Sequence, residues 1–215
     1  LSLSVATGET TEAWSCFFED VIKRGLRQPV MIISDGAKSL INAIERKFPK
    51  SDRQRCIAHK MRNILSKVPN EFQEQVKQAV TAVYYAPEYS TAELLAADFI
   101  EKYSKQFPKA VECFTEDLEA CIIHLKYPAS HHKYIRTTNL IERAFGEQKR
   151  RTKVMPQHQS EQGAIGLVFA VLIRASEKWK KIKMTTLELT TLKNIRNLKC
   201  KDDNQLTNLS YEKVA

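Results

Sequence analysis

The N-terminal part of the chain alternates between strand-like and helix-like patterns of apolar positions. Apolar and polar residues alternate over residues 1–5, which predicts a short strand, and apolar residues recur at helical spacing over residues 10–23. The compact apolar run Val30–Ile33 predicts a buried strand, and a helix with one apolar face follows over residues 40–48. This order of strand, helix, strand and helix implies parallel pairing of the strands. A further short strand is predicted over residues 53–58.

The middle of the chain has a helical pattern only. From Asn63 to Leu125 the apolar residues keep helical spacing, and Pro69, Pro87 and Pro108 divide the segment into long helices. We find no alternating strand pattern within it. The sequence therefore predicts an all-α block inside an α/β protein.

These patterns divide the chain into four segments. After a loop, a basic helix is predicted from about Asn139, and an apolar helix follows it. We predict the first part of an α/β core over residues 1–62, the all-α insertion over residues 63–134 and the second part of the core over residues 135–185. Residues 186–215 become polar and are predicted to form a weakly ordered C-terminal tail.

Composition and charge narrow the classes of function. The chain has 215 residues, and its 34 lysines and arginines outnumber 25 aspartates and glutamates, which gives a net charge of +9. A polyanion is therefore the expected partner, with nucleic acid ahead of an acidic membrane surface. No apolar run is long enough to span a membrane, and five cysteines without framework spacing indicate reduced thiols. We expect a soluble intracellular protein without a membrane partner.

Asp35 is the first candidate for metal chemistry. It stands where the predicted strand Val30–Ile33 ends and a helix begins. In an open α/β sheet, ligands bind at this carboxyl edge of the strands. An aspartate before a helix can equally serve as its N-cap. On the local pattern, metal ligand and N-cap therefore remain alternatives.

Glu142 is the second candidate. It lies in the predicted basic helix, where Asn139 could be the N-cap and Glu142 could reach back to it as in a capping box. Lys149, seven residues later, shares a helix face with Glu142 and could bind a phosphate. Such a charge run can also be a plain solvated helix surface. The surrounding cations favour a metal ligand beside DNA, and they are Lys133, Arg136, Arg143, Lys149, Arg150, Arg151 and Lys153.

Two Cys-x-x-His pairs raise the question of a zinc site. Cys56 and His59 have the same spacing as Cys121 and His124, and four such ligands could form a tetrahedral site. The second pair lies in an amphipathic helix, where cysteine is an ordinary small core residue, so the sequence favours core packing over zinc. A basic cluster beside Cys56 could contact phosphate or be ordinary surface, and it consists of Arg53, Arg55, Lys60 and Arg62.

Several stretches of the chain carry a family resemblance. The chain resembles the C-terminal part of Mutator-type insertion-sequence transposases in RGLRQPVMIISDGAKSL, FPKSDRQRCIAHKMRN and HHKYIRTTNLIERAFGEQKRRTKVMP, with LVFAVLIRASEKW behind them. Their order and spacing agree with that family over about residues 1–181. The resemblance implies an α/β fold with an RNase H-like core, interrupted by the all-α insertion, and a DDE-type enzyme that recombines DNA.

The resemblance also implies roles for individual residues. Asp35 would be the second aspartate of the DDE triad, Glu142 its glutamate and Lys149 the basic residue that follows. Cys56 and His59 match the Cys-x-x-His signature of the family. The carboxylates of the triad would bind two Mg²⁺ or Mn²⁺ ions. The residues expected to contact DNA are Lys149, Arg150, Arg151, Arg136, Asn139, Arg143 and Lys153.

The first aspartate of the triad is expected upstream of these residues. In the family it lies on an earlier strand, and the aspartate that precedes Asp35 here is Asp20, which the pattern places on a helix surface. We therefore expect a truncated transposase, or a fragment of one, with weak metal affinity and little activity of its own. In the complete protein the resemblance implies Mg²⁺-dependent cleavage at element ends and strand transfer into target DNA. A homodimer or larger assembly would do this in the cytoplasm, at the nucleoid.

Two other interpretations remain open. An inactive remnant could act only as a DNA-binding module, which predicts salt-sensitive DNA affinity without metal dependence. A basic helical interaction protein would instead use Asp35 and Glu142 only as helix caps.

Overall fold

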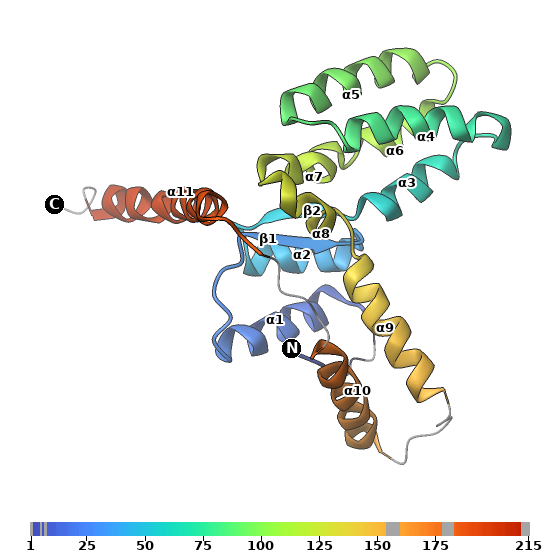
Figure 1. The fold of residues 1–215 in the computed structure, drawn as a ribbon. Coiled ribbons are helices and arrows are strands. Elements are labelled where there is room, and N and C mark those ends of the chain that lie inside the picture. The colour runs from blue at the N-terminus through green and yellow to red at the C-terminus, as the bar shows by residue number, and fades with distance from the viewer. Residues whose placement is uncertain (1, 5, 7, 154–159, 178–182, 212–215) are drawn as a thin grey trace. The chain divides into compact units, whose positions relative to one another are not determined.

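The computed structural model describes residues 2–4, 6, 8–153, 160–177 and 183–211, and most of them are helical (Figure 1). Among these residues, no helix is both long and apolar enough to cross a membrane. The elements, in chain order, are α1 (Thr11–Lys23), β1 (Met31–Ser34), α2 (Lys38–Lys47), β2 (Asp52–Arg55), α3 (Ile57–Leu65), α4 (Asn70–Tyr84), α5 (Tyr89–Tyr103), α6 (Pro108–Thr115), α7 (Leu118–Ile122), the 3₁₀ helices η1 (Ile123–Lys126) and η2 (Ala129–His131), α8 (His132–Ile135), α9 (Asn139–Thr152), α10 (Glu161–Ser176) and α11 (Thr186–Tyr211).

The chain forms two compact units, and each unit consists of three separate segments. The first unit contains residues 1–27, 37–47 and 138–184. The second unit contains the remaining residues, from 28 to 36, 48 to 137 and 185 to 215. Helices α1, α2, α9 and α10 therefore belong to the first unit, and β1, β2, α3 to α8 and α11 belong to the second.

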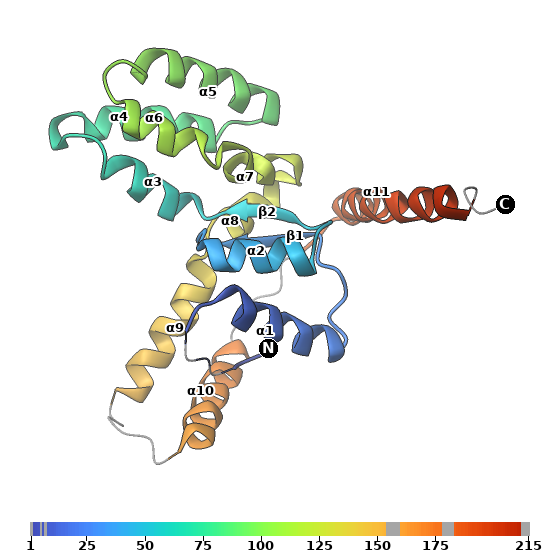
Figure 2. The same cartoon turned by 180° about the vertical axis from the view of Figure 1, so that it is seen from behind.

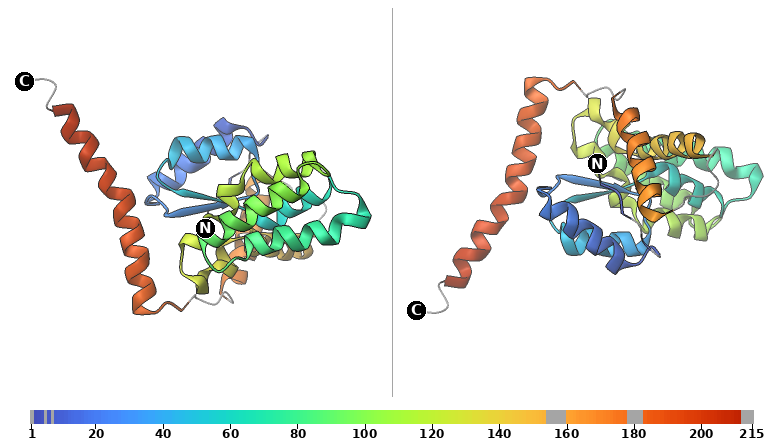
Figure 3. Two further views of the ribbon diagram at one scale, coloured as in Figure 1. Left: turned by 90° about the horizontal axis from the view of Figure 1, so that it is seen from above. Right: turned by 90° about the horizontal axis from the view of Figure 1, so that it is seen from below.

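The second unit is built on a parallel pair of strands, β1 and β2, which lie side by side (Figure 3). Met31 pairs with Asp52 and Ser34 pairs with Arg55, so both strands end at the same edge of the sheet. At this edge the Cys56 N–H donates to the Ser34 carbonyl at 2.8 Å. The strands predicted over residues 30–33 and 53–58 are both present, although β2 ends at Arg55 and a helix follows it closely. The parallel partner of β1 is β2, and not the strand predicted over residues 1–5.

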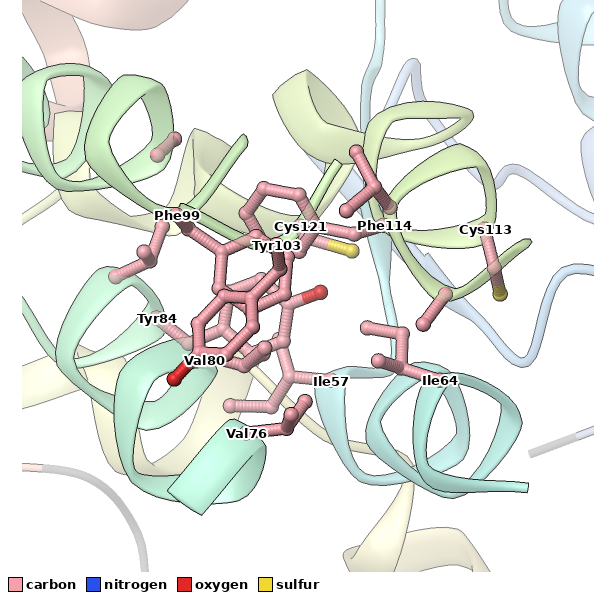
Figure 4. Close-up of a cluster of buried hydrophobic side chains, with 14 of the residues drawn as sticks. Ile57, Ile64, Val76, Val80, Tyr84, Phe99, Tyr103, Cys113, Phe114 and Cys121 are labelled. Atoms are coloured by element: carbon pink, nitrogen blue, oxygen red, sulfur yellow. The ribbon is translucent and has the colours of Figure 1, made fainter. Parts of the chain in front are cut away.

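Helices α3 to α7 of the second unit enclose a hydrophobic core (Figure 4). Tyr84, Phe99 and Phe114 are almost wholly buried there. The ring centroid of Phe114 lies 6.1 Å from that of Tyr84 and 4.5 Å from that of Phe99. Prolines mark helix starts as predicted, because Pro69 precedes α4 and Pro108 opens α6. The all-helical pattern predicted for this part of the chain is therefore confirmed.

In the first unit α1 packs against α2, and α9 packs against α10 (Figure 2). Thr10 caps α1, because its side-chain oxygen accepts the Ala13 N–H at 3.1 Å. An ion pair of 2.5 Å between Lys47 and Glu19 links α2 to α1. The helix predicted over residues 10–23 is confirmed, with Thr10 as its cap.

Two predictions from the apolar pattern differ from the structure. Residues 2–4 have no strand structure, and residues 1 and 5 lie outside the described residues. An alternating pattern gives a stable strand only where neighbouring strands supply hydrogen bonds.

The segment predicted as a weakly ordered tail contains helix α11 up to Tyr211, and residues 212–215 lie outside the described residues. A capping box stabilises the start of this helix. The Glu188 N–H donates to the Thr185 hydroxyl at 3.2 Å, and the Thr185 N–H donates to the Glu188 carboxylate at 2.7 Å. A polar composition therefore did not exclude a helix here.

Candidate functional site

Asp35 directly follows β1 at the carboxyl edge of the sheet. Its side chain is exposed, whereas the preceding Ser34 is buried. Helix α2 begins at Lys38, and the Ile41 N–H donates to the Ala37 carbonyl at 3.0 Å. Ala37, and not Asp35, therefore directly precedes the first residue of α2.

A glycine turn follows Asp35. Gly36 has a φ of +89°, in the left-handed region that favours glycine. A side chain at this position would collide with the guanidinium of Arg55. The same guanidinium donates a hydrogen bond to the main-chain carbonyl of Asp35. Glycine is thus needed at position 36 both for its conformation and for the space it leaves.

The Cys56-x-x-His59 signature lies at the same edge of the sheet. Cys56 follows β2, is wholly buried and occupies the N-cap position of α3. Its Sγ lies 3.2 Å from Nδ1 of His59, about one helical turn later. The Ile57 N–H donates to the Arg136 carbonyl at 3.1 Å, which places the main chain of Arg136 beside the start of α3. This edge therefore gathers Asp35, the signature pair and one residue predicted to contact DNA.

Arg136 also stacks on an aromatic ring. Its guanidinium carbon lies 4.0 Å from the ring centre of Tyr85, which is half exposed. The ammonium of Lys133 lies 4.8 Å from the ring centre of Tyr134. A cation over a tyrosine ring is attracted by the π electrons of that ring. Cations combined with aromatic faces are typical of surfaces that bind single-stranded nucleic acid.

Most of the basic cluster beside the signature is an internal ion-pair network. Arg53, Arg55 and Lys60 have nitrogen atoms 2.9, 3.6 and 3.6 Å from the carboxylate of Asp117, which lies between α6 and α7. Lys60 is only 1% exposed. Arg55 and Lys60 are therefore buried and are not ordinary surface, and the charges of all three residues face a carboxylate within the second unit.

The network keeps Asp117 ionised. Burial raises the pKa of Asp117, but the hydrogen bond and charge of Arg53, together with the charges of Lys60 and Arg55, outweigh burial. The pKa of Asp117 is therefore lowered from its usual value. A charged Asp117 holds cations of β2 and α3 against the junction of α6 and α7.

Glu142 lies near the start of α9, in the first unit. Its carboxylate accepts a hydrogen bond from the Thr138 hydroxyl at 2.6 Å, and Thr138 occupies the N-cap position. Asn139 is therefore the first residue of the helix, and the predicted capping box from Asn139 to Glu142 is wrong. The exposed carboxylate stands in the first turn of α9, near the positive end of the helix dipole, where a negative side chain stabilises the helix.

The basic residues of α9 are exposed. Lys149 follows Glu142 by two helical turns, so the two side chains lie on nearly the same face. Glu147 pairs with Arg150, and with Arg151 at 2.6 Å. Two residues predicted to contact DNA therefore share one carboxylate of their own helix. The exposed residues of this predicted DNA-contacting set in α9 and directly after it are Asn139, Arg143, Lys149, Arg150, Arg151 and Lys153.

Cys121 and His124 belong to the interior of the second unit. The Nδ1 of His124 lies 3.1 Å from the Cys121 carbonyl and 3.2 Å from the side-chain oxygen of Gln54. Burial lowers the pKa of His124 to about 4 and raises the pKa of Cys121 to about 12. Both side chains are therefore neutral near pH 7. The core position that the sequence favoured for Cys121 is confirmed.

Comparison with known proteins decides the family. Residues 1–182 match the family described as "Transposase, Mutator family". The chain belongs to the Mutator family of transposases. The resemblance seen in the sequence motifs is thereby confirmed.

Individual relatives of this Mutator-family chain are transposases of bacterial insertion sequences. The transposase for insertion sequence element IS6120 of Mycolicibacterium smegmatis is 31% identical over 174 residues, which cover 81% of this chain and 54% of the relative. The transposase for IST2 of Acidithiobacillus ferrooxidans is 32% identical over 172 residues, covering 80% and 58%. The transposase for IS256 in transposon Tn4001 of Staphylococcus aureus is 29% identical over 181 residues, covering 83% and 46%. The chain spans about half the length of the curated relatives it matches.

The predicted site residues of this Mutator-family chain fall into two groups. Asp35 and the pair Cys56 and His59 share the carboxyl edge of the sheet in the second unit. Glu142 and Lys149 share a helix face in the first unit.

Two residues around the first group, Asp117 and Arg55, were not recognised as part of its surroundings from the sequence. Asp117 had no motif to single it out, and Arg55 was interpreted only as part of a basic cluster. The available signal was the position of Arg55, within a predicted strand and directly before the Cys-x-x-His signature.

Proposed function

We propose that this chain carries the second and third carboxylates of a DDE-type transposase active site, on part of an RNase H-like core with a helical insertion. The observation that carries this proposal is the position of Asp35. It is an exposed carboxylate directly after a strand, at the carboxyl edge of a parallel sheet, beside the Cys56-x-x-His59 signature. Ligands of α/β proteins bind at such an edge. The predicted insertion, residues 63–134, would contain the end of α3, helices α4 to α7 and most of α8.

The donor chemistry fits a hard divalent cation. Asp35 and Glu142 offer exposed carboxylate oxygens, which Mg²⁺ and Mn²⁺ prefer as ligands. Two such ions, when bound, stabilise the attacking and leaving oxygens of a phosphoryl transfer. The Thr138 hydroxyl, 2.6 Å from Glu142, restricts the orientation of that carboxylate for this role.

The proposed substrate is DNA, at the ends of a mobile element and at its target. The relatives are named as transposases for insertion sequence elements, and we extend DNA cleavage and strand transfer from them to a protein that contains this chain. Lys149, on the face of Glu142, would bind a backbone phosphate, and Arg136 with Tyr85 would offer a cation and an aromatic face. A homodimer or larger assembly acting on nucleoid DNA is part of this proposal.

Metal binding by the 215-residue chain tests the proposal. Mn²⁺ affinity would be measured by electron paramagnetic resonance titration, with and without a DNA duplex. Asp35→Asn and Glu142→Gln are each expected to weaken Mn²⁺ affinity by at least about tenfold, or about 1.4 kcal/mol. Asp20→Asn is the matched control, because Asp20 is an exposed carboxylate of α1 that pairs with Arg24 at 3.3 Å.

Unchanged Mn²⁺ affinity in both variants would contradict the proposed metal site. DNA binding that depends on salt but is indifferent to Mn²⁺ and to both substitutions would favour the DNA-binding module instead. In a longer protein that contains this chain and cleaves DNA, Glu142→Gln should abolish the cleavage.

A further inference from the structure

Two consecutive main-chain carbonyls at the end of β1 are held by the last residue of β2 and by the residue that follows it. The Ser34 carbonyl accepts the Cys56 N–H at 2.8 Å, and the Asp35 carbonyl accepts a hydrogen bond from the Arg55 guanidinium. The chain then turns through Gly36, with a φ of +89°. The main chain on both sides of the Asp35 side chain is therefore restrained by contacts within the second unit.

Arg55 is itself held by the helical block, which consists of α3 to α7. It is buried, and its Nε lies 3.6 Å from Oδ2 of Asp117. Asp117 precedes α7 and also pairs with Arg53 at 2.9 Å and with Lys60 at 3.6 Å. A continuous series of contacts thus runs from the junction of α6 and α7, through Asp117 and Arg55, to the main chain of Asp35.

Arg55 differs from the other two cations of this network in the partners that it contacts. All three pair with Asp117, but within the part of the chain that the structure describes only Arg55 also bonds to Asp35. A guanidinium can serve both partners, because its donors point in several fixed directions within one plane. A lysine ammonium is a compact point charge and cannot contact both partners in the same way. Lys60 also pairs with Glu116 at 3.4 Å, so the three cations face two carboxylates, and the bond to Asp35 is a contact of Arg55 beyond this charge balance.

We propose that Arg55 is a positioning residue that orients Asp35, and that Asp117 holds Arg55 for this role. The proposal rests on the proposed function, in which Asp35 binds a divalent metal. Metal and catalytic ligands must be held within about 0.5 Å of their productive geometry by supporting contacts. The helical block would thus take part in the active site, because it supplies the carboxylate that keeps the turn after β1 in place.

Hydrogen exchange tests the contact itself. Exchange of the main-chain amides of residues 34–38 would be followed by mass spectrometry on the 215-residue chain. Arg55→Gln is expected to increase the exchange rate of this segment by at least about tenfold, because the turn opens more often. Arg53→Gln is the matched control, since it removes a cation from the same strand and from the same Asp117 but no bond to Asp35. The control should leave exchange of residues 34–38 unchanged.

Arg55→Lys separates positioning from folding. It keeps a positive charge near Asp117, so the amides of α4 to α7 should keep their protection while residues 34–38 still exchange faster. Asp117→Asn should loosen the same turn, because Arg55 loses its partner. Asp117→Glu keeps the negative charge and should restore most of the protection.

Mn²⁺ titration measures metal affinity, which should not change if Arg55 only stabilised the fold. Arg55→Lys is expected to weaken Mn²⁺ binding by about tenfold at the site that also depends on Asp35. The midpoint of unfolding of this variant should be unchanged. Equal exchange of residues 34–38 in the wild type and in both Arg55 variants would overturn the positioning role, whatever the metal result. In another outcome, the Arg55 variants exchange faster at residues 34–38 but Mn²⁺ binding does not depend on Asp35. This outcome would support the contact of Arg55 with the turn and would contradict the proposed function.

Discussion

Buried polar side chains tie β2 to the helical block of the second unit. The side-chain amide of Gln54 donates to the carbonyls of Arg55 and Cys121 at 2.7 and 3.0 Å, and its oxygen accepts the His124 N–H at 3.0 Å. Gln54 is wholly buried, and a buried polar group left without partners costs about 1–3 kcal/mol. These bonds therefore favour one placement of β2 against α7 and η1, which apolar contacts alone would not select.

His124 makes the stability of the protein depend on pH. Its pKa is about 4 in the folded state, because of burial and the nearby charge of His132, and about 6.5 in an unfolded chain. Between these pH values the unfolded state binds a proton that the folded state excludes, so stability falls as the pH falls from 6.5 toward 4. We expect the free energy of unfolding to be about 2 kcal/mol lower at pH 5 than at pH 7. Urea unfolding followed by circular dichroism measures this difference.

The control for this prediction is His124→Asn, which removes the titrating ring. The variant should be less stable at pH 7 but should lose little further stability between pH 7 and pH 5. Carboxylates with a lowered pKa, such as Asp117, do not titrate in this range, because the ordinary pKa of that group is already 3.8. The same pH dependence in the wild type and the variant would show that another group is responsible.

At the scale of elements, the helices follow from signals that each segment contains. The Thr10 cap of α1 and the prolines before α4 and at the start of α6 act on neighbours within about one turn. Such local signals can be recognised in a sequence. The strand predicted over residues 1–5 required a partner from elsewhere in the chain, which an alternating pattern cannot specify. The box from Thr185 to Glu188 was a local signal, but the polar composition after it obscured the helix.

The candidate site likewise combines residues that can be recognised in the sequence with contacts that cannot. Asp35 and Glu142 were recognised because each lies at the boundary of an element and within a motif that resembles the family. The bond from Arg55 to Asp35 joins residues on two strands, and the pair of Arg55 with Asp117 joins a strand to the helical block. These contacts depend on how elements pack, so sequence analysis assigned Arg55 only to a basic cluster.

Helix α9 carries a counterion for its own basic surface. Glu147→Gln removes the partner of Arg150 and Arg151, and exposed pairs of this kind contribute at most about 1 kcal/mol to stability. Both arginines would then be available to phosphates. We expect DNA affinity to increase several-fold, and the slope of log affinity against log salt to become steeper by about one to two. Fluorescence anisotropy with a labelled duplex at several salt concentrations measures both quantities.

The matched control is Glu71→Gln, which changes the net charge equally at an exposed position in the first turn of α4. Lys149→Gln should act in the opposite direction and reduce the slope by about one. Equal increases in affinity for Glu147→Gln and Glu71→Gln would mean that net charge, and not the surface of α9, governs DNA binding.

At the scale of the whole molecule, stability depends strongly on the core of the helical block. Phe114 is wholly buried against Tyr84 and Phe99, so Phe114→Ala should lower the free energy of unfolding by about 3–5 kcal/mol. Urea unfolding measures this loss, which is a large part of the total for a typical protein. Leu94→Ala is the control on α5, where Leu94 is 74% exposed, and should change stability by less than about 0.5 kcal/mol. A loss below about 1 kcal/mol for Phe114→Ala would contradict this packing.

The chain passes between its two units after residues 27, 36, 47, 137 and 184. A ribosome adds about 5–20 residues per second, so α1 and α2 are made roughly 5–20 seconds before synthesis of the last segment of their unit begins at residue 138. During that time their apolar faces can bind chaperones or other nascent chains. Residues 48–137 form the longest uninterrupted segment of either unit, and they hold the core around Phe114. The core in residues 48–137 can therefore begin to fold before the first unit is complete.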